Sequence, residues 1–150
     1  MVPLVLAACS HAGKYRHVDP PELKSAVELS GRELWPGDEL RIRLEVTNPH
    51  ENGIYREFGN TCRFGFRIAS ATGETVGRSG EICFDVPAEL YIDAGETVVH
   101  GFSWIWDSSE LPPGRYDVLA GLGEDGRLAT AGPVRISLRA DSRPTPVQPN

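Results

Sequence analysis

Hydrophobic and polar residues alternate with a period of two along much of the chain. Between residues 39 and 47, the leucines, the isoleucine and the valine occupy the even positions, and glutamates, arginines and a threonine occupy the odd ones. This alternation is typical of a β-strand with one face in the core and the other in solvent. It recurs along the sequence and predicts strands over residues 39–47, 64–68, 74–77, 90–92, 97–106, 116–122 and 134–138.

Turn residues separate these segments, and none of the segments has helical periodicity. Asp125-Gly126, a strong hairpin signal, lies between the last two. Many short strands with regularly spaced turns predict an all-β fold, an antiparallel immunoglobulin-like β-sandwich of about seven to eight strands. Phe102, Trp104 and Trp106 share one side of the longest predicted strand. We expect them in the core and not on a sugar-binding surface, because the inward face of a long strand buries large aromatic residues best.

The N-terminal residues resemble the end of a bacterial lipoprotein signal peptide. The sequence LAAC at residues 6–9 has the form of a lipobox, in which the thiol of Cys9 is acylated and becomes the new N-terminus. The charged start and the length of a complete signal are missing, so either the start is assigned too late or the chain is truncated, and we expect a truncated signal over residues 1–8. Ser10 after the cysteine resembles the pattern that directs lipoproteins to the outer membrane of diderm bacteria. A short buried strand with a structural cysteine is the alternative.

These features divide the chain into four predicted segments. We expect the signal peptide over residues 1–8 and a polar, flexible tether over residues 9–22. Residues 23–139 contain all the predicted strands and form the sandwich. Residues 140–150 are rich in proline and have no apolar periodicity, so we expect a disordered tail.

Several sequence elements follow one another over about residues 36–123. They are a Pro-Gly-acid turn that starts a strand ending in Thr47-Asn48, the strand and turn from Phe64 to Glu74, the turn Ala94-Gly95-Glu96, the pair Trp104 and Trp106 closed by Asp107, and the run Leu111-Pro112-Pro113-Gly114-Arg115-Tyr116. In this order and spacing, the chain resembles the BsuPI-type domain, the family of intracellular proteinase inhibitors and their secreted relatives. The resemblance implies an immunoglobulin-like sandwich and, as activity, the inhibition of proteinases.

Composition and charge limit the classes of partner. The 150 residues are 40% hydrophobic and 24% charged, which is the balance of one globular domain. The formal net charge is −6, and the arginines are dispersed among acidic residues. Proteins that bind nucleic acids need a basic surface, so we expect no such partner. After residue 10, no segment reaches the roughly 18 apolar residues of a membrane-spanning helix.

Two cysteines remain if Cys9 carries lipid. Cys62 and Cys83 form an even pair in an exported protein, where disulfides persist, so we expect a bond between them. Two separate buried thiols are the alternative. A zinc site needs a close cysteine pair or nearby histidines, and this spacing has neither. We therefore expect no metal and no cofactor.

The sequence contains no recognisable catalytic motif. A nucleophile elbow, a zinc-protease helix, a phosphate-binding loop and a dinucleotide-binding glycine motif are all missing. The four histidines are scattered, and His100 lies on a predicted strand, where a core or sheet-edge histidine is the favoured interpretation. The run Asp107-Ser108-Ser109-Glu110 precedes a Leu-Pro-Pro-Gly turn, where clustered Asp and Ser residues cap the backbone. We therefore expect that the protein is not an enzyme.

The remaining surface for recognition is in the loops. Two of them, residues 50–60 and 108–115, carry the side chains that we expect to anchor a partner: Tyr55, Phe58 and Arg115. The BsuPI resemblance offers the alternative that Tyr55 and Phe58 are strand residues of the fold. The predicted function is a lipid-anchored, non-enzymatic binding module of the bacterial cell envelope that inhibits a proteinase through its loops. A structural accessory without inhibitory activity is the alternative.

Overall fold

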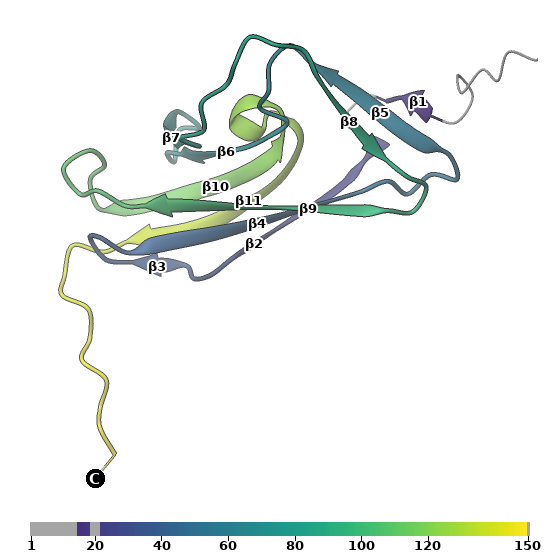
Figure 1. Ribbon diagram of the computed structural model, residues 1–150. Helices are drawn as coiled ribbons and strands as arrows, with labels where there is room; N and C mark the ends of the chain where they lie inside the picture. Colours follow the sequence, from purple (N-terminus) through teal and green to yellow (C-terminus); the bar gives the residue numbers. More distant parts are fainter. Residues whose placement is uncertain (1–14, 19–21, 150) are drawn as a thin grey trace, which may run out of the picture.

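The computed structural model describes residues 15–18 and 22–149. In this part of the chain, regular secondary structure consists of strands and one 3-10 turn (Figure 1). The strands are β1 (Tyr15–His17), β2 (Lys24–Leu29), β3 (Glu33–Leu34), β4 (Glu39–Thr47), β5 (Gly53–Phe58), β6 (Phe64–Ala69), β7 (Thr75–Arg78), β8 (Ala88–Ile92), β9 (Thr97–Ile105), β10 (Gly114–Leu122) and β11 (Leu128–Leu138), and the turn η3 (Glu124–Gly126) joins the last two. None of the described segments is a helix with the length and hydrophobicity needed to cross a bilayer.

The strands form three sheets. The large sheet has the order β3-β11-β10-β6-β7, the small sheet β2-β4-β9 and the end sheet β1-β5-β8. Most neighbouring strands are antiparallel, while the short strands β1 and β3 pair in parallel with β5 and β11. Figure 1 shows the end sheet at one end of the molecule, beside the other two sheets. The prediction of an all-β antiparallel sandwich is confirmed.

The core lies between the large and small sheets and extends under the end sheet. Alternate residues of β4 are buried, as the sequence pattern predicts, and they meet the buried side chains of β6, β10 and β11. Phe102 and Trp106 are buried, and Trp104 is half-buried against the same cluster, so the predicted aromatic core positions are confirmed. Burial of this apolar surface is the main favourable contribution to folding.

All seven strands that the alternation predicts are present, but four further strands escaped the sequence pattern. On β5 the residues that face inward are Ile54, Arg56 and Phe58, so a charged residue interrupts the apolar alternation. Arg56 lies there because its Nη1 donates a hydrogen bond to the carbonyl of Val18, 3.2 Å away. The strand β2 is only half-buried on its inner face, which weakens its pattern.

Part of the predicted flexible tether belongs to the fold, so that prediction is wrong for residues 15–18. Tyr15–His17 form β1, which pairs with β5, and the next residue, Val18, is buried in the core. The edge of β5 offers main-chain hydrogen bonds to this segment, which no local pattern reveals. In the tail, described to residue 149, the guanidinium of Arg143 lies 4.8 Å from the ring centre of Trp35 and pairs with Asp38.

A buried asparagine holds the corner between the small sheet and the end sheet. The Nδ2 of Asn48 donates to the carbonyls of Asn52, Ile92 and Asp93 at 2.8–3.2 Å, and its Oδ1 accepts from the amide of His50 at 3.0 Å. These bonds satisfy main-chain groups just after β4, just before β5 and at the end of β8. The corner therefore fixes how the end sheet, with β5 and β8, joins the small sheet.

The turn η3 folds back onto the outer surface of the large sheet. A Cβ at Gly65 would lie only 2.6 Å from the amide nitrogen of Asp125 and 2.7 Å from the carbonyl oxygen of Gly123. Asp125 has a φ of 62°, in the left-handed region. The Asp-Gly pair does connect two antiparallel strands, as predicted, but through a 3-10 turn that lies flat on β6 instead of a tight hairpin.

Candidate functional site

The connection between β7 and β8, residues 79–87, is an exposed loop rich in apolar side chains. The exposed fractions are 78% for Ile82, 62% for Phe84 and 57% for Val86. Large hydrophobic side chains gathered in one exposed segment mark an interaction site more often than chance exposure does. We call residues 79–87 the cystine loop, because a disulfide holds it.

The cystine loop is fastened to the connection between β5 and β6. Cys62 and Cys83 form a disulfide with a Cα–Cα distance of 5.3 Å, so the predicted bond is present. The amide of Thr61 donates to the carbonyl of Phe84 at 3.1 Å, and the amide of Phe84 donates to the Thr61 hydroxyl at 3.0 Å. Figure 1 shows the two connections meeting at the top of the molecule. The loop is therefore held in one conformation although its side chains are exposed.

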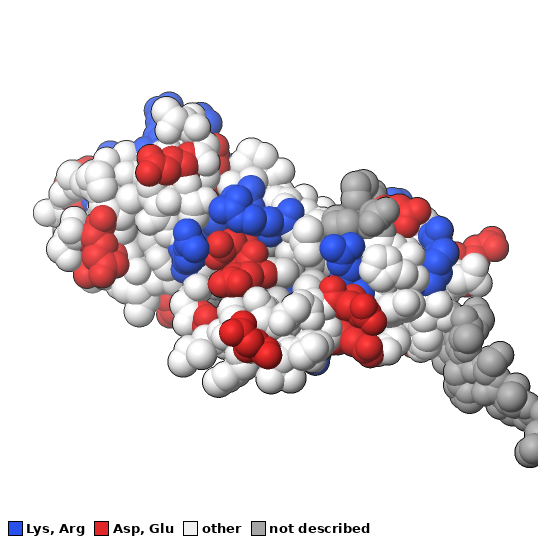
Figure 2. Space-filling view, turned by 90° about the horizontal axis from the view of Figure 1, so that it is seen from above, with Lys and Arg blue, Asp and Glu red and all other residues white. Residues whose placement is uncertain are grey.

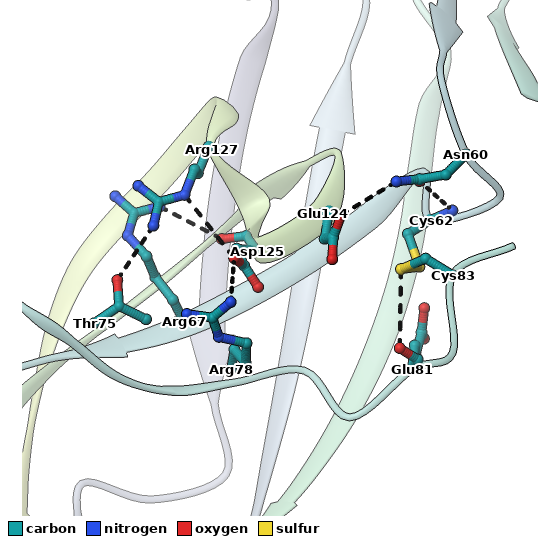
Figure 3. A network of polar contacts seen from close by, with 10 residues as sticks. All are labelled: Asn60, Cys62, Arg67, Thr75, Arg78, Glu81, Cys83, Glu124, Asp125 and Arg127. Carbon is teal, nitrogen blue, oxygen red and sulfur yellow. Dashed lines mark hydrogen bonds and ion pairs between the residues drawn. A yellow bond between two sulfur atoms is a disulfide. The ribbon is translucent and has the colours of Figure 1, made fainter. Parts of the chain in front are cut away.

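A polar network fixes the entry to the cystine loop (Figure 3). The carboxylate of Asp125 pairs with Arg78, at the end of β7, at 3.2 Å and with Arg127 at 4.0 Å. Arg67 donates to the Asp125 carbonyl at 3.4 Å, and burial together with the nearby charge of Arg127 lowers the pKa of Arg67. Asn60 links the same turn to the disulfide, because its Nδ2 donates to the carboxylate of Glu124 at 3.2 Å and its Oδ1 accepts from the amide of Cys62 at 3.0 Å. The network anchors the strand that leads into the loop.

His100 holds the loop from the other side. Its ring stacks on Phe64 with centroids 4.6 Å apart, and its Nε2 lies 3.4 Å from a carboxylate oxygen of Glu81. The ring also contacts Phe102, at a centroid distance of 4.7 Å. The prediction of a core or sheet-edge histidine is confirmed, because His100 lies on β9, an edge strand of the small sheet.

The structure does not bring the three predicted anchor residues together. Phe58 is 8% exposed and belongs to the core, so the prediction that its side chain contacts a partner is wrong. Tyr55 lies half-buried on the outer face of the end sheet, and Arg115 is exposed at the start of β10. Figure 1 places the end sheet and the start of β10 at opposite ends of the molecule. Phe58 is buried because residues 53–58 form a strand where the sequence predicts a loop.

The second predicted loop, residues 108–115, is closed by its own hydrogen bonds. The indole of Trp106 donates to the carbonyl of Leu111 at 2.8 Å, and the hydroxyl of Tyr116 donates to the carbonyl of Pro112 at 2.7 Å. Burial raises the pKa of Tyr116. The carboxylate of Asp107 accepts from both the hydroxyl and the amide of Ser109, which lowers the pKa of Asp107. The predicted capping role of Asp107 is confirmed.

Charge does not dominate the surface around the cystine loop. Figure 2, which looks down on the top of the molecule as drawn in Figure 1, shows basic and acidic side chains next to one another between wide areas of other residues. Among the described residues, no group of three His, Cys, Asp or Glu side chains is placed to hold a metal ion. Cys9, the predicted lipidation site, lies outside the described residues.

A model of the family described as BsuPI, intracellular proteinase inhibitor, matches residues 27–125. This chain belongs to the BsuPI family. The match runs from within β2 to η3 and includes the cystine loop and both cysteines. The resemblance inferred from the sequence is therefore confirmed. Because the family is one of inhibitor domains, membership suggests that the chain acts by binding a proteinase and not by catalysis.

Comparison of this BsuPI domain with solved structures finds similar chains at low sequence identity. The alkylpurine DNA glycosylase AlkC of Pseudomonas fluorescens is 14% identical with a TM-score of 0.52, over 79% of this chain and 31% of that one. The sporulation control protein Spo0M of Bacillus subtilis is 16% identical with a TM-score of 0.49, over 80% and 50%. The chain thus spans about a third of the glycosylase and half of Spo0M, and the likeness to the glycosylase shows the fold alone. A search of curated proteins returned no match.

The cystine loop is the feature that the sequence analysis missed. Ile82, Phe84 and Val86 stand in a segment that carries no predicted strand, yet they are as apolar as the core residues. The expected bond between Cys62 and Cys83 already placed this segment next to the residues around Cys62. Apolar residues outside any strand and next to a disulfide were the signal that could have revealed the loop.

The disulfide should contribute measurably to stability. Reduction is expected to lower the free energy of unfolding by about 3 kcal/mol, because the bond closes a loop with a sequence separation of 21 residues. Thermal unfolding with and without reductant measures this effect, and mass spectrometry of the non-reduced protein should show the two cysteine peptides linked. Two free thiols in the air-oxidised, folded protein would contradict the bond.

Proposed function

We propose that this BsuPI domain is a lipid-anchored proteinase inhibitor of the bacterial cell envelope and that it blocks its target with the cystine loop. The observation that carries the proposal is an exposed apolar loop fastened by a disulfide in a member of an inhibitor family. A loop that is already ordered loses little conformational entropy on binding. Such a loop can enter a cleft and remain folded there.

The chemistry of the loop indicates the kind of cleft that it fits. Ile82 and Phe84 present apolar side chains, and ligand clefts are lined mainly by apolar groups. The main-chain amide and carbonyl of Phe84 are both bonded to Thr61, so Phe84 acts through its side chain. The favoured target is a proteinase whose substrate cleft accepts large apolar side chains.

Inhibition assays test this proposal directly. The disulfide-bonded protein is titrated against serine and cysteine proteinases whose primary specificity pockets accept apolar, basic or small side chains. We expect competitive inhibition of the proteinases with apolar pockets. If the protein inhibits none of the panel, the inhibitor proposal fails and the structural accessory role is favoured.

The lipid anchor and the envelope location are parts of the proposal that rest on the residues before β1. The LAAC sequence that ends in Cys9 supports acylation of that cysteine. Expressed in a bacterial host with a complete signal sequence, the protein is expected to partition into the detergent phase, and Cys9→Ala is expected to abolish this partitioning. Equal partitioning of wild type and variant would refute the anchor and leave the inhibition assay unaffected.

A further inference from the structure

The outer face of the end sheet carries aromatic and acidic side chains that the inhibitory function does not use. On β5 and β8 alternate residues point inward, all of them apolar except Arg56, and the intervening residues face outward. The strand register places Tyr55 opposite Tyr91, and Glu57 opposite Glu89. On the other side of β5, His17 pairs with Tyr55 in the parallel register of β1. We call Tyr55, Glu57, Glu89 and Tyr91, together with His17, the tyrosine-glutamate face.

The rings of this face contact one another. Tyr55 and Tyr91 stack with centroids 6.0 Å apart and an angle of 29° between their planes. His17 packs edge-on against Tyr55 with a centroid distance of 5.5 Å. Tyr91 is nevertheless 50% exposed. Tyr15 also packs edge-on with Tyr91, at a centroid distance of 5.1 Å, so the rings form one partly exposed aromatic cluster. Exposed π-faces of aromatic rings attract cations.

The two carboxylates of this face stand directly opposite each other. Like charges in this position on neighbouring strands destabilise a sheet. Among the described residues, neither Glu57 nor Glu89 takes part in an ion pair. The hydroxyl of Tyr91 donates a hydrogen bond to Glu89, and this bond, with burial and the charges of both glutamates, raises the pKa of Tyr91. The face thus carries two carboxylates, and neither has an ion-pair partner in the part of the chain that the structure describes.

We propose that the tyrosine-glutamate face binds a segment of a partner protein that carries arginine or lysine side chains. A guanidinium group stacks on tyrosine rings and forms paired hydrogen bonds with a carboxylate, so arginine satisfies both kinds of group on this face. A bound cation also removes the repulsion between Glu57 and Glu89. The proposal is independent of the cystine loop, which lies on a different connection.

The test uses the full, disulfide-bonded chain and a short synthetic peptide of alternating arginine and threonine. Isothermal titration at low salt is expected to show binding, and a peptide with citrulline in place of arginine is expected to bind about tenfold more weakly. Citrulline keeps the shape of arginine and removes its charge. The double variant Glu57→Gln/Glu89→Gln is expected to lose about tenfold in affinity for the arginine peptide. Tyr91→Leu is expected to lose about threefold.

A matched control separates this face from a general effect of charge. Glu74→Gln/Glu110→Gln removes the same two charges from exposed positions elsewhere, and its affinity for the arginine peptide is expected to stay within about twofold of wild type. Equal losses in the two double variants would show attraction by net charge only and overturn the proposal. Equal affinity for the citrulline peptide, or no binding of the arginine peptide to the wild-type protein, would overturn it as well.

Discussion

Replacing Gly65 by alanine is expected to lower the free energy of unfolding by about 4 kcal/mol or more. The new Cβ would lie 2.6–2.8 Å from three main-chain atoms of the turn between β10 and β11, closer than packed atoms allow. Main-chain atoms cannot move aside as the end of a flexible side chain can. The turn must lift off the sheet, which also separates Asp125 from Arg78 and Arg67. Losses of this size are exceptional for a single methyl group.

Gly101→Ala is the matched control for this substitution. Gly101 also lies within a strand, β9, but a Cβ there has no neighbouring atom within 4 Å. We expect its free energy of unfolding to stay within about 0.5 kcal/mol of wild type, or to rise slightly, because glycine weakens a strand interior. Denaturant titrations of both variants measure the difference. A Gly65→Ala protein as stable as Gly101→Ala would refute the close packing of the turn on β6.

The double variant Ile82→Ser/Phe84→Ser is expected to weaken proteinase inhibition by at least about 100-fold. A few side chains carry most of the energy of an interface, and truncating one such side chain costs about 2 kcal/mol or more. Both residues are largely exposed in the free protein, so their removal should leave the unfolding midpoint nearly unchanged. The inhibition constant is measured against a proteinase that the wild-type protein inhibits.

Two comparison variants make this result specific. Val99→Ser/Ile105→Ser removes two exposed apolar residues from the outer face of β9, outside the cystine loop, and should inhibit as wild type does. Tyr55→Ala/Arg115→Ala tests the surface that sequence reasoning favoured, and it should also inhibit normally. If it loses inhibition while the cystine-loop variant retains it, the inhibitory surface lies where the sequence predicted and the role of the cystine loop is wrong.

The sequence predicted the strands whose signal is local. On β4 and β10 apolar residues occupy alternate positions without interruption, and the structure buries them as the pattern requires. It also predicted the bond between Cys62 and Cys83, because the inferred export signal made an even cysteine pair informative. Family membership could be predicted too, since the turns and aromatic pairs of the BsuPI domain keep their order along the chain.

The strands that escaped prediction depend on partners distant in sequence. On β5, Arg56 takes an inward position because the carbonyl of Val18 accepts its hydrogen bond, and no pattern within residues 53–58 reveals this. The strand β1 is ordered by pairing with the edge of β5. Such contacts join segments far apart in the chain, so their free energy has no local sequence signal.

Residue types and their spacing alone determined the all-β class, the alternating core of the sandwich and the cysteine pair. The tertiary structure decided which apolar residues are exposed. Phe58 and Phe84 are the same residue type, and the alternation places both outside the predicted strands. Phe58 is nevertheless buried at the end of β5, whereas Phe84 projects from the cystine loop. The physical reason is that burial depends on which sheet covers a residue. The position of each residue relative to the sheets is set by strand pairing, a disulfide and the Asn48 corner, which join distant parts of the chain.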